Sequence, residues 1–90
     1  MADMKRAEEC RGAVLGYLYA RPTVAQTVET IATRLRITEW DFSTDEVRGA
    51  CVFLCGLDLL KSIRGQLGGS TLHYQITSKG TIEHEGSQAQ

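Results

Sequence analysis

The fold of this chain is decided by the stretch STDEVRGACVFLCGLDLLKSI, residues Ser43–Ile63. Its first four residues form a capping box, in which the serine hydroxyl and the glutamate carboxylate satisfy amides that a helix start leaves unpaired. The apolar residues that follow have the spacing of one helical face: Val47, Ala50, Cys51, Leu54 and Leu57. Asp58 stands where a residue in the left-handed region often ends a helix. We therefore predict a helix over Ser43–Leu57 and a strand over Leu59–Ile63.

Two further helices are expected before this stretch. The first, Asp3–Ala20, ends before Pro22, because the residue before a proline avoids the helical region. Its apolar face consists of Met4, Ala7, Val14, Leu15 and Leu18. The second, Thr27–Arg36, begins at a threonine cap, and its apolar face consists of Val28, Ile31, Ala32 and Leu35. Trp40 and Phe42, in the connector that follows, are expected to pack on the core.

A hairpin is expected after the third helix. Gly65–Ser70 has the composition of a turn, and Thr71–Thr77 alternates apolar and polar residues as a half-buried strand does. We expect the hairpin to end at Lys79–Gly80 and residues 86–90 to form a flexible tail. The chain is then one α+β domain over residues 1–85, with three helices followed by a two-stranded hairpin. One core cluster is predicted from Leu15, Leu18, Ile31, Leu35, Val47, Leu54, Leu72, Tyr74 and Ile76.

The composition is that of a single small globular domain. The chain has 90 residues, of which 42% are hydrophobic, and this length suits one domain. No signal peptide is expected, and no apolar run approaches the roughly 18 residues that span a bilayer, so we expect a cytoplasmic location without a membrane partner. Its three cysteines are an odd number, which favours reduced thiols.

Charge is unevenly distributed along the chain. The net charge is −1, which is not the balance of a protein that grips DNA through bulk charge. Between residues 47 and 80, however, four basic residues stand against the single acidic residue Asp58, a local charge of +3. The four are Arg48, Lys61, Arg64 and Lys79. This positive segment covers the third helix and the hairpin.

The order of three helices and a hairpin resembles the winged helix-turn-helix superfamily. Ser43–Ile63 is similar to the family's recognition helix running into its first wing strand, and YQITSKG, Tyr74–Gly80, is similar to the segment that leaves the wing. The runs STDEVRG and LDLL, at Ser43–Gly49 and Leu57–Leu60, also resemble small winged-helix proteins of Mu-like phages and prophages. The resemblance implies a DNA-binding protein, a small phage or bacterial transcriptional regulator. Its third helix would enter the major groove of double-stranded DNA, and its wing would lie on the backbone or minor groove.

The resemblance also implies which positions of the third helix and the wing face outward, where DNA would lie. On the third helix the outward positions are Thr44, Arg48, Gly49, Val52 and Phe53, and on the wing they are Arg64, Gln66, Ser70 and Thr71. Arg48 has the fork that matches O6 and N7 of guanine, and Lys61, Arg64 and Lys79 carry charges that neutralise phosphates. The alternatives are an Arg48 in solvent that is paired with Asp45 or a neighbouring acidic residue, and hairpin charges that only protect a strand edge.

Two features favour a winged helix that binds protein and not DNA. Asp45 and Glu46 open the helix that would read DNA, where negative charge opposes phosphates. Val52 and Phe53 occupy positions where polar side chains are expected, and exposed apolar residues mark a surface for a protein partner or a homodimer. We expect the first helix or the Trp40 connector to cover one of the two.

The sequence carries no motif of catalysis or metal binding. It has no phosphate loop, nucleophile elbow or paired carboxylates, and the glycines of Gly65–Gly69 lie in a hairpin turn and not before a helix. Cys51 and Cys55 are four residues apart, whereas zinc sites usually use closer cysteine pairs or histidine pairs. We expect no enzymatic activity, no cofactor and no metal.

Overall fold

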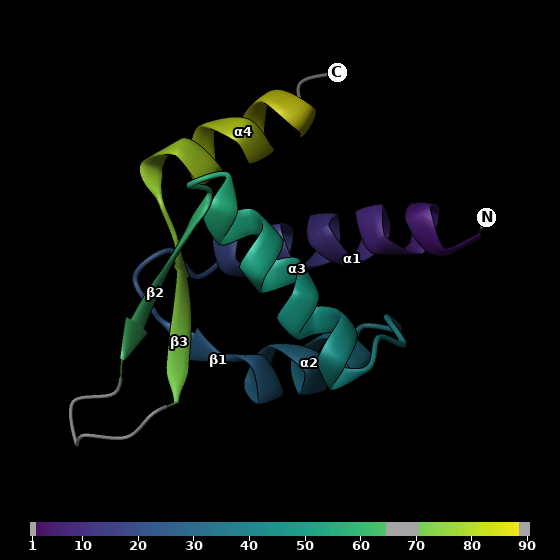
Figure 1. Ribbon diagram of the computed structural model, residues 1–90. Coiled ribbons are helices and arrows are strands. Elements are labelled where there is room, and N and C mark those ends of the chain that lie inside the picture. The colour runs from purple at the N-terminus through teal and green to yellow at the C-terminus, as the bar shows by residue number, and fades with distance from the viewer. Residues whose placement is uncertain (1, 65–70, 89–90) are drawn as a thin grey trace.

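The computed structural model describes residues 2–64 and 71–88, which form four helices and three strands (Figure 1). In chain order these are α1 (Ala2–Tyr19), β1 (Gln26–Thr27), α2 (Val28–Ile37), α3 (Thr44–Gly56), β2 (Leu60–Arg64), β3 (Leu72–Ile76) and α4 (Ser78–Gln88). None of the helices in these ranges is long and apolar enough to cross a lipid bilayer. The predicted α+β class is confirmed, and the three predicted helices and the hairpin occur in the predicted order.

Local capping sets the ends of α2 and α3. The amide of Glu46 donates to Ser43 Oγ at 3.1 Å and the amide of Ser43 donates to a Glu46 carboxylate oxygen at 2.9 Å, which completes the capping box. Beyond the other end of α3, Asp58 has a φ of 63°, in the left-handed region. Helix α2 begins at Thr27, whose Oγ1 accepts from the amide of Thr30 at 3.2 Å. These devices are local in sequence, so the start of α2 and both ends of α3 could be placed in advance.

The three strands form an antiparallel sheet in the order β1-β3-β2. Tyr74 of the central strand pairs with Gln26 of β1 and with Ser62 of β2. The sequence does not predict β1, because two residues are too few to show an alternation of their own. Its pairing with β3 holds it in place, and the buried Gln26 side chain accepts a hydrogen bond from the hydroxyl of Tyr17 at 2.5 Å.

The core lies between α1, α2, α3 and the inner face of the sheet. The predicted core residues that are buried are Leu15, Leu18, Ile31, Leu35, Val47, Leu54, Tyr74 and Ile76. Leu72 is the exception and is exposed, because it starts β3 opposite Arg64 at the far end of the hairpin. Met4, Leu57 and Trp40 are also exposed, which corrects their predicted packing, whereas Phe42 is buried as expected.

Helix α4 corrects the predicted architecture of three helices and a tail. The chain is helical from Ser78 to Gln88, so the predicted boundary at residue 85 falls inside a helix. Thr77 caps this helix, because its Oγ1 accepts from the amide of Gly80 at 3.0 Å. The prediction is wrong here because two glycines and a single large apolar residue, Ile82, give the segment no helical periodicity.

Tertiary contacts hold α4 where its own sequence does not. The helix contacts α1, where the rings of Tyr19 and His84 are 4.5 Å apart and the Tyr19 hydroxyl donates to Glu85 at 2.9 Å. At its other end, the backbone of Gly80 approaches the chain so closely that a Cβ there would lie 2.2 Å from the carbonyl oxygen of Leu59. Only glycine fits this contact without movement of the backbone.

Candidate nucleic-acid interface

Helix α3 has one face in the core and one face directed away from it. Its buried residues are Val47, Ala50, Cys51 and Leu54. On the outward face, Arg48, Gly49, Val52 and Phe53 are exposed and Thr44 is half-buried. Figure 1 shows the β2–β3 hairpin extending from the C-terminal end of α3, with β1 and α2 beside it. The phase predicted for α3 is confirmed, while the DNA contacts assigned to its outward face stay a prediction.

A cleft of about 380 Å³ lies between α2, α3 and β3. It is lined by Val28, Glu29, Arg48, Val52, Thr71, Leu72 and Tyr74. Arg48 comes from the expected recognition helix and Thr71 from the expected wing, so the fold brings these two predicted residues to one surface. The cleft also holds an acidic residue that the sequence did not single out, Glu29.

The two basic residues of β2 lie on opposite faces of the hairpin. Because side chains alternate along a strand, Arg64 shares a face with the buried Leu60, and Lys61 occupies the other face. Arg64 pairs in register with Leu72, which lines the cleft, and directly opposed residues project to the same side of a sheet. Arg64 therefore lies on the same side of the hairpin as the cleft, and Lys61 does not.

The remaining predicted wing residues divide into two groups. Gln66 and Ser70 lie outside the described residues. Lys79 is a correction, because it belongs to the first turn of α4 and lines a separate hollow with Leu57 and Glu83. Among the described basic residues expected on the wing, Arg64 alone lies on the side of the cleft.

Two carboxylates from different helices flank the guanidinium of Arg48. Its Nη1 donates to Asp45 Oδ1 at 2.7 Å within α3, and its Nη2 lies 3.8 Å from Glu29 Oε2 of α2. The side chain of Arg48 is 50% exposed, and those of Asp45 and Glu29 are 92% and 67% exposed. The pairing with Asp45 that the sequence offers as an alternative to base reading is therefore present. Pairs this exposed exchange readily with other partners, because each contributes little free energy.

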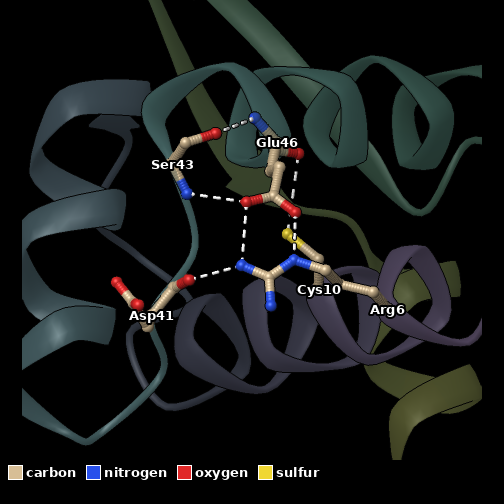
Figure 2. Close-up of polar contacts among 5 residues, drawn as sticks. All are labelled: Arg6, Cys10, Asp41, Ser43 and Glu46. Carbon is tan, nitrogen blue, oxygen red and sulfur yellow. Dashed lines mark hydrogen bonds and ion pairs between the residues drawn. The ribbon is translucent and has the colours of Figure 1, made fainter. Parts of the chain in front are cut away.

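The second acidic residue at the start of α3, Glu46, faces Arg6 of α1 (Figure 2). It is not among the residues that line the cleft. Arg6 of α1 holds its carboxylate with two donors, Nε to Oε2 and Nη2 to Oε1, the second at 3.0 Å. Arg6 Nη2 also donates to the main-chain oxygen of Asp41 at 2.5 Å, and Cys10 Sγ donates to that of Glu46 at 3.5 Å. Sequence reasoning missed Arg6, whose partner lies 40 residues away and shares no local pattern with it.

The Arg6–Glu46 contact changes the electrostatics of the helix start. The guanidinium of Arg6, together with the Ser43 amide, lowers the pKa of Glu46 to about 2. A bidentate pair of this kind fixes geometry as well as charge. Both acidic residues that open α3 are thus bound to arginines, so the negative charge that the sequence sets against phosphates is partly neutralised within the domain.

Val52 and Phe53 are neighbours in sequence but have different surroundings. Val52 is 59% exposed and lines the cleft beside Arg48, whereas Phe53 is 43% exposed and lies under the guanidinium of Arg11, 3.6 Å from the ring centroid. The expectation that one of them is covered is wrong, although α1 shields part of Phe53. Trp40 stacks on Phe42 instead, with ring centroids 5.4 Å apart.

The cysteines are free thiols, of which Cys10 and Cys51 are buried and Cys55 is half-buried. Burial raises the pKa of Cys51 to about 12 and that of Cys10 to about 11, so both are poor nucleophiles at neutral pH. Within residues 2–64 and 71–88, no group of three or more His, Cys, Asp or Glu side chains is arranged to hold a metal ion.

Comparison with known proteins finds likeness in structure and not in sequence. No family model and no curated protein matches the chain. A PadR-like transcription factor from Bacteroides fragilis is similar with a TM-score of 0.78 at 16% identity, over 98% of this chain and 84% of the other. The S. aureus MepR–DNA complex is similar with a TM-score of 0.72 at 20% identity, over 97% of this chain and 70% of the other.

A MepR mutant from a multidrug-resistant S. aureus clinical isolate is also similar, with a TM-score of 0.71 at 22% identity over 87% of this chain. This chain spans about half of the MepR mutant and of a Lactococcus lactis ZitR mutant, 53% and 49%. At these identities the likeness concerns the fold. The helices, the capped α3 and the hairpin together are those of the winged-helix fold.

Proposed function

We propose that this domain binds double-stranded DNA as a small bacterial or phage transcriptional regulator. The observation that carries the proposal is the cleft in which Arg48 of α3 and Thr71 of the hairpin lie together, with Arg64 on the same side. In a winged helix, these two elements meet the major groove and the adjacent backbone. The likeness to MepR, solved with DNA, supports the same use of the fold here.

Each residue has a different task in this proposal. Arg48 reads a guanine edge, because its two forked donors match O6 and N7. Arg64 neutralises a phosphate next to the groove, and Thr71 donates its hydroxyl to the same backbone. Thr44 lies at the start of α3, and Gly49 lets the helix approach the groove without a side chain. Gln66 and Ser70 lie outside the described residues and stay predicted contacts from the sequence alone.

The experiment that tests DNA binding is a salt titration with random duplex DNA. The logarithm of the association constant falls linearly with the logarithm of salt concentration, with a slope of about −0.9 for each phosphate neutralised. We expect measurable binding at low salt and a slope that corresponds to a few phosphates, because the basic surface is small. A protein without duplex binding at low salt contradicts the proposal.

A protein-binding winged helix is the second candidate, and one observation favours it. Val52 and Phe53 are both exposed on the outward face of α3, and clustered apolar side chains at a surface are typical of interfaces. The partner in this candidate is another protein or a second copy of the chain. In that case α3 has no specific site for duplex DNA, and the only role of Arg48 is to form ion pairs with Asp45 and Glu29.

A further inference from the structure

The acidic residues around Arg48 come from two helices and meet at one guanidinium. Asp45 precedes Arg48 by one turn of α3, and Glu29 stands in the first turn of α2, where it lines the cleft. The carboxylate of Asp45 lies 2.7 Å from Nη1 of Arg48, and the carboxylate of Glu29 lies 3.8 Å from Nη2. The third acidic residue nearby, Glu46, takes no part, because Arg6 and Ser43 hold its carboxylate.

DNA offers an arginine two kinds of acceptor, the phosphates and the base edges. The carboxylates of Asp45 and Glu29 affect the binding of Arg48 to these two acceptors differently. A phosphate that approaches Arg48 also approaches Asp45 and Glu29, and the like charges repel over this short range. A guanine edge offers two acceptor atoms without a net charge, so it replaces the carboxylates at the fork without that repulsion. The arrangement therefore penalises backbone contacts at Arg48 more than it penalises base contacts.

We infer that Asp45 and Glu29 are positioning residues that hold Arg48 for a base edge and lower its affinity for the phosphate backbone. The inference rests on the proposed DNA binding and adds a specificity device to it. It gives a role to Asp45 at the start of α3, whose charge would otherwise only weaken DNA binding. Because both carboxylates are exposed, they release Arg48 readily when a matching base takes their place.

The test compares charge-neutralising variants of the full chain. Asp45→Asn and Glu29→Gln each remove one carboxylate at Arg48, Asp45→Glu keeps the charge, and Glu9→Gln removes one exposed carboxylate from α1. Binding to random duplex is measured at one salt concentration, and base preference is measured by sequencing the fraction bound from a randomised pool. We expect Asp45→Asn to bind random duplex about threefold to tenfold more tightly, with its preference for guanine at one position reduced.

The controls separate this inference from the proposed function. We expect Asp45→Glu to keep the wild-type base preference, because it keeps the charge. Glu9→Gln should raise the affinity for random duplex less than Asp45→Asn does. Equal effects of Asp45→Asn and Glu9→Gln in a protein that binds duplex overturn the inference and leave DNA binding intact. Absence of duplex binding by the wild type, at low salt, overturns both.

A second measurement needs no DNA. In the free protein, we expect the carboxylates to slow rotation of the Arg48 guanidinium, which NMR detects through the exchange of its side-chain nitrogens. Asp45→Asn should speed this rotation, whereas Glu9→Gln should leave it unchanged. An Arg48 side chain that is equally mobile in the wild type and in Asp45→Asn overturns the positioning role.

Discussion

Glu46 shows how one side chain can serve the structure of a helix and its electrostatics together. Its carboxylate accepts from the Ser43 amide within the capping box and from Arg6 across the α1–α3 contact (Figure 2). The adjacent Asp45 has no such role and pairs with Arg48. Two neighbouring acidic residues therefore do different work, and only their surroundings distinguish them.

The lowered pKa of Glu46 makes a prediction about acid stability. Its folded pKa of about 2 lies below its ordinary value of 4.5, so the charged form stabilises the fold above about pH 4.5 and this contribution is lost as the pH falls toward 2. We predict that Glu46→Gln, which keeps the shape of the capping box, destabilises the protein at neutral pH. The difference in unfolding free energy from the wild type should shrink between pH 4.5 and pH 2.

Urea unfolding at a series of pH values measures this difference. Glu8→Gln on the exposed side of α1 is the matched control and should show a smaller dependence over the same range. A Glu46→Gln variant whose difference from the wild type is constant from pH 7 to pH 2 contradicts the ion pair with Arg6.

At the scale of elements, α4 depends on a close backbone contact at its first turn. The Cβ of an alanine at position 80 would lie 2.2 Å from Leu59 O and 2.8 Å from Ile76 Cγ1. We predict that Gly80→Ala destabilises the domain by about 1–3 kcal/mol, the usual cost of overpacking, because the backbone must move. Chemical denaturation measures the loss.

Gly86→Ala in the same helix is the control with the opposite expectation. A Cβ there meets no atom within 4 Å, and alanine is favoured over glycine in a helix by roughly 0.5–1 kcal/mol. Gly86→Ala should therefore leave stability unchanged or raise it slightly. If Gly80→Ala behaves in the same way, α4 does not lie against Leu59 as described.

The elements that could be predicted are those whose signals are local. Ser43, Glu46 and Asp58 bound α3 within the stretch itself, so its limits and buried face follow from sequence. The strand β1 and the helix α4 exist through partners elsewhere in the chain, and neither has a periodic pattern. The same holds for the site: the outward face of α3 follows from its phase, but the Arg6–Glu46 and Arg48–Glu29 pairs join separate helices and are visible only once the chain has folded.

At the scale of the whole molecule, Arg48 of the DNA proposal and Phe53, the aromatic residue of the protein-binding candidate, lie on different sides of α3. Arg48, Val52 and the cleft face the side on which Arg64 lies. Phe53 faces α1, lies under Arg11 and lines a separate hollow of about 230 Å³ with Glu83 of α4. Substitutions can therefore disturb one side without the other, which a single shared surface would not allow.

This separation gives a matched set of variants for deciding the function. Arg64→Ala and Lys61→Ala remove equal charge from the two faces of β2, so a difference between them reports position and not net charge. If the domain binds DNA, Arg64→Ala weakens all duplex sequences alike and reduces the salt slope by about one, because one phosphate contact is lost. Lys61→Ala has the smaller effect, and Phe53→Ala leaves duplex binding near that of the wild type.

If the domain binds protein, the order of the variants reverses. Phe53→Ala then dominates, because aromatic residues at the centre of an interface carry much of its binding energy. For a partner that is a second copy of the chain, sedimentation equilibrium detects the loss as a weaker self-association. The two basic-residue variants change that association little. The DNA proposal is contradicted if Arg64→Ala leaves the salt slope unchanged and Phe53→Ala weakens self-association. That result supports the second candidate.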